Sequence, residues 1–108
     1  MNIRNGFQMV ARVDEIPQGT SKVVQVNGKS IAVFNIEGRF YAIYSVCPHE
    51  GGPLGKGRLK GFVVSCPWHD LAFDVRSGQG TDGGGYCVGS YEVYVESDEV
   101  FVGGRRKT

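Results

Sequence analysis

The sequence lacks the features that mark several large classes of protein. Its 108 residues contain no apolar run near the roughly 20 residues of a membrane-spanning helix. The first residues carry no signal-peptide core, and no stretch has the pattern of an ordinary amphipathic helix. Twelve Lys and Arg against 11 Asp and Glu give a net charge of +1, which does not favour nucleic acid or an anionic membrane. We therefore expect a cytoplasmic protein without either partner.

Cysteine and histidine are scarce. Three cysteines, an odd number, do not make a disulfide framework in a reducing compartment, and only two histidines are present. A chain this short, with 41% apolar residues, buries one modest core. We expect a single domain over residues 1–108, because an enzyme fold of several hundred residues does not fit this length.

Glycine, by contrast, is abundant. There are 17 glycines, and 11 of them lie between Gly51 and Gly89. Aromatic and β-branched residues stand between them, so this half of the chain is not a flexible linker. Such a concentration indicates tight turns, or a backbone that must approach something closely.

The dominant hydrophobic period is two, which predicts strands. Asn27-Gly28 and Ser97-Asp98 are turn signals between pairs of such runs, residues 13–17 fit one helical turn, and we expect residues 103–108 to be frayed. Many short strands predict an all-β antiparallel sandwich or small barrel. The predicted strands cover residues 7–13, 22–26, 30–36, 39–45, 62–65, 71–75, 91–95 and 99–102.

Two loops interrupt this regular pattern, and they hold both histidines. The first contains Cys47-Pro48-His49, and the second contains Cys66-Pro67-Trp68-His69. Each loop follows a predicted strand and offers one thiolate and one imidazole. Two sulfur and two nitrogen ligands suit either a tetrahedral structural zinc or a Rieske [2Fe–2S] cluster. Zinc modules usually pair Cys with Cys and His with His, so the mixed pairs favour two irons.

At these residues the sequence resembles the Rieske motif, Cys-x-His followed by Cys-x₂-His, and the segment 71–78 also fits that family. The similarity is greatest to soluble Rieske-type ferredoxins that serve aromatic-ring dioxygenases. It implies a Rieske fold whose cluster-binding subdomain covers about residues 46–78. It also implies one [2Fe–2S] cluster per chain. The implied ligands are Cys47, His49, Cys66 and His69.

The resemblance further implies a one-electron carrier that is not itself an enzyme. It would be a monomer that accepts electrons from an NAD(P)H-dependent reductase and passes them to a terminal oxygenase. Two alternatives stay open: a small iron–sulfur subunit of an oxidoreductase such as NAD(P)H nitrite reductase, and a zinc-stabilised interaction module.

Departures from the family bear on the reduction potential. High-potential members carry a disulfide between the two loops, and a serine and a tyrosine that donate hydrogen bonds to the cluster. The corresponding positions here hold Gly52 with Trp68, Leu71 and Phe73, which cannot supply them. We therefore expect a potential near the low end of the Rieske range, about −150 mV.

Other residues near the loops have simpler interpretations. We expect Cys87 to be a buried free thiol and Trp68 to pack or to present a contact face. Glu50 and Asp70 are either an acidic docking rim or ordinary solvated charges. Three basic residues, Lys56, Arg58 and Lys60, are expected in a solvated loop, and the backbone of Gly51, Gly52 and Gly55 is expected to offer N–H groups to the cluster.

Overall fold

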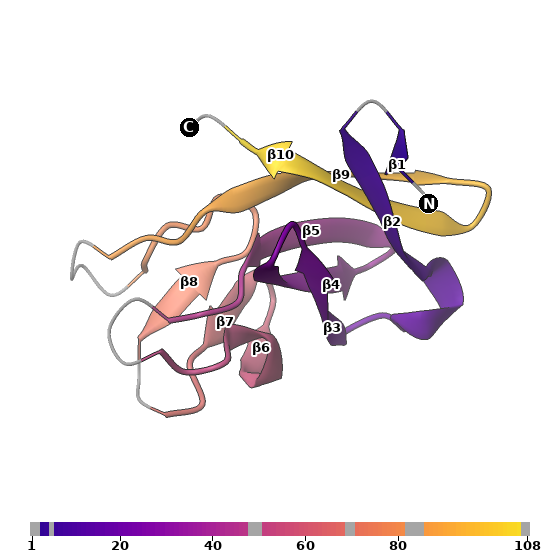
Figure 1. Ribbon diagram of the computed structural model, residues 1–108. Coiled ribbons are helices and arrows are strands. Elements are labelled where there is room, and N and C mark those ends of the chain that lie inside the picture. Colours follow the sequence, from indigo (N-terminus) through magenta and orange to yellow (C-terminus); the bar gives the residue numbers. More distant parts are fainter. Residues whose placement is uncertain (1–2, 5, 48–50, 69–70, 82–85, 107–108) are drawn as a thin grey trace.

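The computed structural model describes residues 3–4, 6–47, 51–68, 71–81 and 86–106. Within these ranges the protein is all-β, and no helix is long and apolar enough to cross a membrane (Figure 1). The strands are β1 (Ile3–Arg4), β2 (Phe7–Arg12), β3 (Ser21–Val26), β4 (Lys29–Ile36), β5 (Arg39–Tyr44), β6 (Arg58–Lys60), β7 (Val63–Ser65), β8 (Ala72–Asp74), β9 (Ser90–Glu96) and β10 (Glu99–Arg105). Two 3₁₀ turns, η1 (Val13–Glu15) and η2 (Leu54–Lys56), stand between them.

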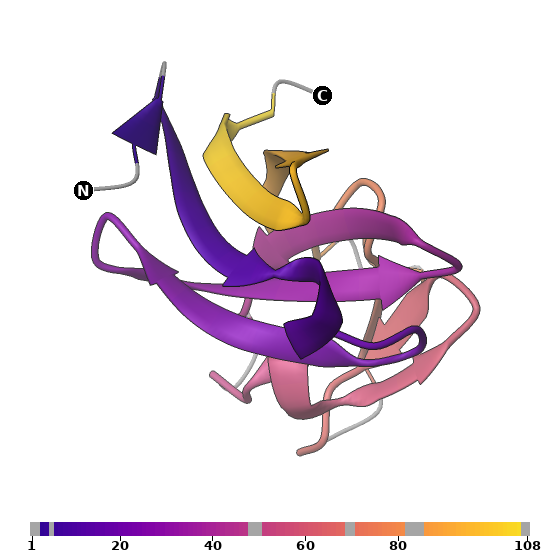
Figure 2. The same cartoon turned by 90° about the vertical axis from the view of Figure 1, so that its right-hand side faces the viewer.

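The strands form two antiparallel sheets. The larger has the order β1-β2-β10-β9-β5-β4-β3, and the smaller has the order β6-β7-β8. The large sheet curls until β2 approaches β3, where the Gln8 side-chain amide donates to the carbonyl oxygen of Gln25 over 3.2 Å (Figure 2). The small sheet lies beside this nearly closed barrel (Figure 1). The predicted fold class is therefore confirmed.

The predicted turns between strands also hold. Asn27 and Gly28, which join β3 to β4, have φ angles of 52° and 78°. Ser97 and Asp98, which join β9 to β10, have φ angles of 53° and 64°. Two consecutive left-handed residues give a twist that matches the flanking strands. The second turn accepts this conformation without a glycine.

Strand β4 is buried on both of its faces. All six residues from Ile31 to Ile36 are buried, so the alternation of the strand does not separate core from solvent. Ile31 and Val33 point into the barrel, whereas Ala32 and Phe34 point toward the small sheet. One strand thus belongs to two hydrophobic cores.

The second core lies between the barrel and the small sheet, and both cysteines of the two loops belong to it. Its members pack β4 and β5 against β7 and β8. Full burial of a large apolar side chain stabilises the folded state by about 1.5–3 kcal/mol. The core consists of Ala32, Phe34, Ile36, Ile43, Cys47, Leu54, Val64, Cys66, Phe73, Val75 and Val88.

The structure corrects two expectations. The basic stretch 56–60 is not a loop: Lys56 ends η2, and the short strand β6 carries Arg58 and Lys60, although all three side chains are solvated as expected. The tail is not frayed from residue 103, because β10 continues to Arg105. Gly103 is buried there, with the ring of Phe7 occupying the space that a Cβ would need.

Gly55, in η2, packs directly on the barrel wall. A Cβ at this position would overlap the Val23 side chain and lie 3.2 Å from the Cβ of Ala32. Its carbonyl oxygen accepts a 2.6 Å hydrogen bond from the Ser21 hydroxyl, and its N–H donates to the buried Ser45 hydroxyl over 3.2 Å. These contacts fix η2, which follows the first cysteine loop, against β3 and β4.

The substitution Gly55→Ala should therefore destabilise the folded protein by about 1–3 kcal/mol, the usual cost of overpacking. Gly104→Ala is the matched control, because Gly104 has open space where a Cβ would be. Urea denaturation of both variants measures the difference. Equal midpoints for the two variants would contradict this account of η2.

Candidate metal centre

The first cysteine loop begins just after β5 and is closed by two backbone hydrogen bonds. The Cys47 N–H donates to the carbonyl oxygen of Gly52 over 2.9 Å, and the Gly51 N–H donates back to the carbonyl oxygen of Cys47 over 2.8 Å. An isolated bridge between Val46 and Pro53 extends the closure by one residue pair. The loop 47–52 therefore stands on a rigid base.

The second loop repeats this closure. The Cys66 N–H donates to the carbonyl oxygen of Leu71 over 2.8 Å, and the next pair, Ser65 with Ala72, belongs to the β7–β8 ladder. In both loops a cysteine N–H thus binds the carbonyl five residues later. Each loop contains one cysteine and one histidine in the sequence. The structure shows that the two loops are closed over the same number of residues and by the same kind of hydrogen bond.

The two loops meet at Gly52. An ideal Cβ on Gly52 would lie 2.6 Å from the Sγ of Cys66 and 3.2 Å from two ring atoms of Trp68. The Cys66 sulfur and the Trp68 ring therefore cover the backbone of the first loop. Cys47 and Cys66 are only 1% and 4% exposed. The structure thus brings the two predicted cysteine ligands into one buried region under two touching loops.

The remaining predicted ligands, His49 and His69, lie outside the described residues, as do Glu50 and Asp70. Among the residues that the structure does describe, no three His, Cys, Asp or Glu side chains gather as a metal site. The four-ligand assignment therefore stays a prediction, and so does the acidic rim.

Comparison with known proteins decides the family. The profile of the Rieske [2Fe-2S] domain matches residues 6–88. The chain is 33% identical over 104 residues to ferredoxin CarAc of Metapseudomonas resinovorans, covering 94% of this chain and 95% of that protein.

The chain belongs to the Rieske [2Fe–2S] domain family.

Two further relatives are similar to this chain over only part of their own length. The ferredoxin component of the naphthalene 1,2-dioxygenase/salicylate 5-hydroxylase systems of Ralstonia sp is 41% identical over 64% of this chain and 66% of its own length. Human apoptosis-inducing factor 3 is 31% identical over 86% of this chain, which spans only 16% of that protein. This Rieske chain thus spans less than two thirds of both relatives.

Solved structures give the same result. A chain in the complex of reduced oxygenase and oxidized ferredoxin in carbazole 1,9a-dioxygenase superimposes with a TM-score of 0.87 and 31% identity, over 97% of this chain and 99% of that chain. A nitrite reductase small subunit superimposes at 20% identity, a likeness that shows the fold alone. The predicted Rieske ferredoxin family and its [2Fe–2S] cofactor are confirmed, and the zinc-module alternative is withdrawn.

The described part of this Rieske site fits a cluster held by cysteine sulfur. The space beside the Gly52 Cα is already occupied by the Cys66 sulfur, so that even the methyl group of an alanine would not fit there. Thiolate sulfur is the donor that iron–sulfur clusters require from cysteine. Leu71 and Phe73 stand where high-potential Rieske proteins have hydroxyl side chains. Phe73 is fully buried and Leu71 is half-buried, so both apolar side chains pack in the interior.

Two of the expected glycine N–H groups have other partners. The Gly51 N–H donates to Cys47, and the Gly55 N–H donates to Ser45. A glycine is required at position 55 because η2 packs directly on the barrel. A glycine is favoured at position 51 because the φ angle there is 77°, a left-handed conformation that other residues rarely adopt. For these two residues the prediction of N–H groups directed at the cluster is wrong. Only the close approach at Gly52 matches the expectation of a backbone near the site.

Cys87 is exposed, which corrects the expectation of a buried thiol. The segment alternates, with Val88 buried in the second core and Cys87 facing outward beside Gln79, its partner in an isolated bridge. The apolar neighbours indicated burial, but the period of two places adjacent residues on opposite faces.

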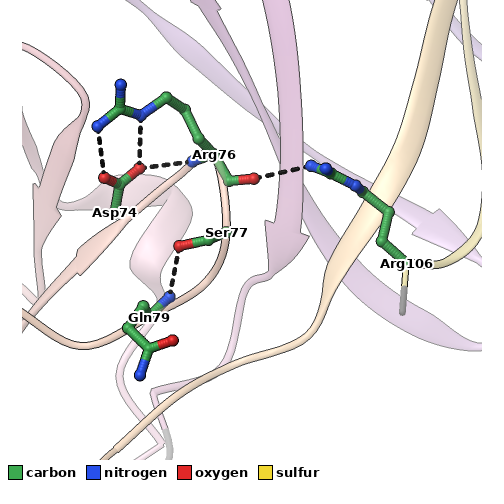
Figure 3. A network of polar contacts seen from close by, with 5 residues as sticks. All are labelled: Asp74, Arg76, Ser77, Gln79 and Arg106. Carbon is green, nitrogen blue, oxygen red and sulfur yellow. Dashed lines mark hydrogen bonds and ion pairs between the residues drawn. The ribbon is translucent and has the colours of Figure 1, made fainter. Parts of the chain in front are cut away.

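The turn after β8 is fixed by an ion pair (Figure 3). The Arg76 guanidinium donates two hydrogen bonds to the Asp74 carboxylate, over 3.0 and 2.7 Å, and also lies 4.1 Å above the Phe62 ring. The bonds from Arg76 hold the pKa of Asp74 below its ordinary value, and the bond to Asp74 raises the pKa of Arg76. Nothing in the sequence pattern signalled this pair, whose members stand two residues apart.

Gly52→Ala should displace the Cys66 sulfur or the Trp68 ring and so weaken cluster retention by about 1–3 kcal/mol, the cost of overpacking. The variant should hold less iron per chain and lose its visible absorbance faster during incubation with a chelator. Gly61→Ala is the control, because Gly61 has open space around it and lies outside both loops, although its positive φ adds strain. If Gly52→Ala kept iron as well as Gly61→Ala, the loops would not meet as described.

Proposed function

We propose that this chain carries single electrons from an NAD(P)H-dependent reductase to a terminal oxygenase. One observation carries the proposal. Two loops of equal length, each closed by a cysteine N–H, meet at Gly52 in a chain that aligns over 94% of its length with a ferredoxin. Relatives that are ferredoxin components of dioxygenase and alkene monooxygenase systems support the oxygenase as acceptor.

The proposed ligands are Cys47 and His49 from the first loop and Cys66 and His69 from the second. When bound, a [2Fe–2S] group takes up and releases one electron at a time. Two thiolates and two neutral imidazoles place two fewer negative charges around it than four thiolates do. An added electron is therefore less strongly disfavoured than in an all-cysteine site.

The buried side of the site has a separate role. Both cysteine sulfurs lie in the second core, beside fully buried Leu54 and Phe73. Apolar burial excludes water from the thiolates, and the side chains of Leu71 and Phe73 carry no hydroxyl that would stabilise added charge. The pairing of Gly52 with Trp68 leaves the two loops without a disulfide between these positions. These features support a potential near the low end of the Rieske range.

Trp68 marks the surface that we assign to partner contact. Its side chain is 61% exposed although it rests against Gly52 in the first loop. Tryptophan is enriched where protein surfaces bind one another. An electron carrier must meet two partners in turn, so we propose a small, weak interface here and a monomeric, cytoplasmic protein.

A redox titration tests this function. The purified holoprotein should take up one electron per chain, with a midpoint at about −150 mV, the low end of the Rieske range. The reduced protein should then pass that electron to cytochrome c, a general one-electron acceptor, with one cytochrome reduced per chain. An apoprotein prepared by acid treatment serves as the control and should do neither.

Two results would count against the proposal. Uptake of no electron, or failure to reduce cytochrome c, would contradict the role of carrier. A clearly positive midpoint would instead contradict the explanation from Gly52, Leu71 and Phe73, while leaving the carrier role intact.

A further inference from the structure

A small hollow lies where the start of β9 meets the end of β10. Its volume is about 40 Å³. A space of roughly 10–15 Å³ by this measure holds one water molecule, so the hollow can admit one small group such as a carboxylate. The polar residues that line it are Ser77, Gln79, Cys87, Ser90, Arg105 and Arg106.

The hollow has a thiol at its mouth. Cys87 is exposed and is a free cysteine. Its neighbour Val88 is anchored in the second core, and its partner across the isolated bridge is Gln79. The backbone at this thiol is therefore fixed on both sides, and the proposed electron carrier does not use it.

Two arginines line the same hollow. Arg105 lies over Gly89, whose missing Cβ would be 3.0 Å from the arginine Nε. Arg106 donates its backbone N–H to the carbonyl oxygen of Ser90 over 2.7 Å and its guanidinium to the carbonyl oxygen of Arg76 over 2.8 Å (Figure 3). Within the described residues neither guanidinium forms an ion pair with a carboxylate. None of the described residues that line the hollow is acidic, so this lining is cationic.

Ser90 gives an independent indication of a ligand. The residue is 3% exposed, and its hydroxyl oxygen has no hydrogen-bond partner among the described residues. Buried hydroxyl groups are usually paired, and an unpaired one is costly. A carboxylate in the hollow could accept a hydrogen bond from this hydroxyl and pair with both arginines.

We propose that Cys87 is a modification site that forms a mixed disulfide with a low-molecular-weight disulfide bearing carboxylates. The Cys87 thiolate attacks one sulfur of the disulfide RSSR; a Cys87–SR bond forms, the S–S bond breaks, and RS⁻ leaves with the electron pair. Cys87 is oxidised and half of the reagent is reduced, so the exchange balances. One carboxylate occupies the hollow, and the rest of the group stays in solvent.

The test compares two disulfides of opposite charge on the holoprotein. Glutathione disulfide is the anionic probe and cystamine is the cationic one, and intact-protein mass measures the rate of adduct formation. We expect a single adduct, absent in Cys87→Ser, that forms without loss of the visible absorbance of the cluster. The anionic probe should react faster than the cationic one.

Removing the charges of Arg105 and Arg106 then distinguishes recognition of the anionic probe by the hollow from mere exposure of the Cys87 thiol. Two charges about 6 Å apart in water contribute roughly a threefold effect on a rate. The double variant Arg105→Gln/Arg106→Gln should therefore slow the anionic probe by about tenfold and speed the cationic one, so that the ratio of anionic to cationic rates falls by more than about tenfold. The matched control Arg39→Gln/Arg58→Gln removes two exposed arginines that do not line the hollow and should leave the ratio unchanged. Ser90→Ala should slow the anionic probe alone.

Three results would overturn the proposal: equal rates for the two probes on the unmodified sequence, an unchanged ratio in the double variant, or an adduct on Cys47 or Cys66 in place of Cys87. If the double variant does not fold, the single variants Arg105→Gln and Arg106→Gln give the same comparison, each slowing the anionic probe by about threefold. None of these results depends on whether the chain carries electrons.

Discussion

The structure depends on the burial of strand β4 on both faces. Ile31 and Val33 fill the barrel, while Ala32 and Phe34 fill the space between the barrel and the small sheet. The second core depends on this arrangement, because the small sheet β6-β7-β8 has three short strands and contributes only Val64 and Phe73 as buried members of that core. Side chains of β4 and β5 complete it. The cysteine loops rise from this shared core, so their position follows from the packing of the barrel.

The same core explains why the site is both rigid and apolar. Cys47 and Cys66 are members of the core as well as of the loops, and each loop closes through the backbone N–H of its cysteine. The contact at Gly52 then brings the loops together without a covalent link between them. A site of this kind is preorganised before any partner arrives, which suits a protein that must exchange an electron during brief encounters.

Much of the fold and of the family could be predicted from sequence, because both depend on local signals. Period-two runs and Asn27-Gly28 indicated the hairpins, and the mixed Cys and His pairs indicated the cluster. The rest depended on tertiary packing. Ile31 to Ile36 reads as an ordinary apolar strand, and nothing in it shows that its two faces belong to two cores. The position of Gly55 near His49 in the sequence suggests a role at the cluster, whereas its contact with Val23 on β3 decides its role. The apolar neighbours of Cys87 suggest burial, whereas the alternation of the strand turns Val88 inward and Cys87 outward.

The central claim is that each loop contributes one cysteine and one histidine, so that two nitrogen ligands accompany two sulfur ligands. Pulsed EPR of the reduced holoprotein, with ¹⁵N-histidine labelling to assign the couplings, tests it most directly. The account predicts couplings from two histidine nitrogens, reduced to one when either His49 or His69 is replaced by cysteine. A reduced cluster without any histidine coupling, or a colourless protein that contains zinc and no acid-labile sulfide, would contradict it.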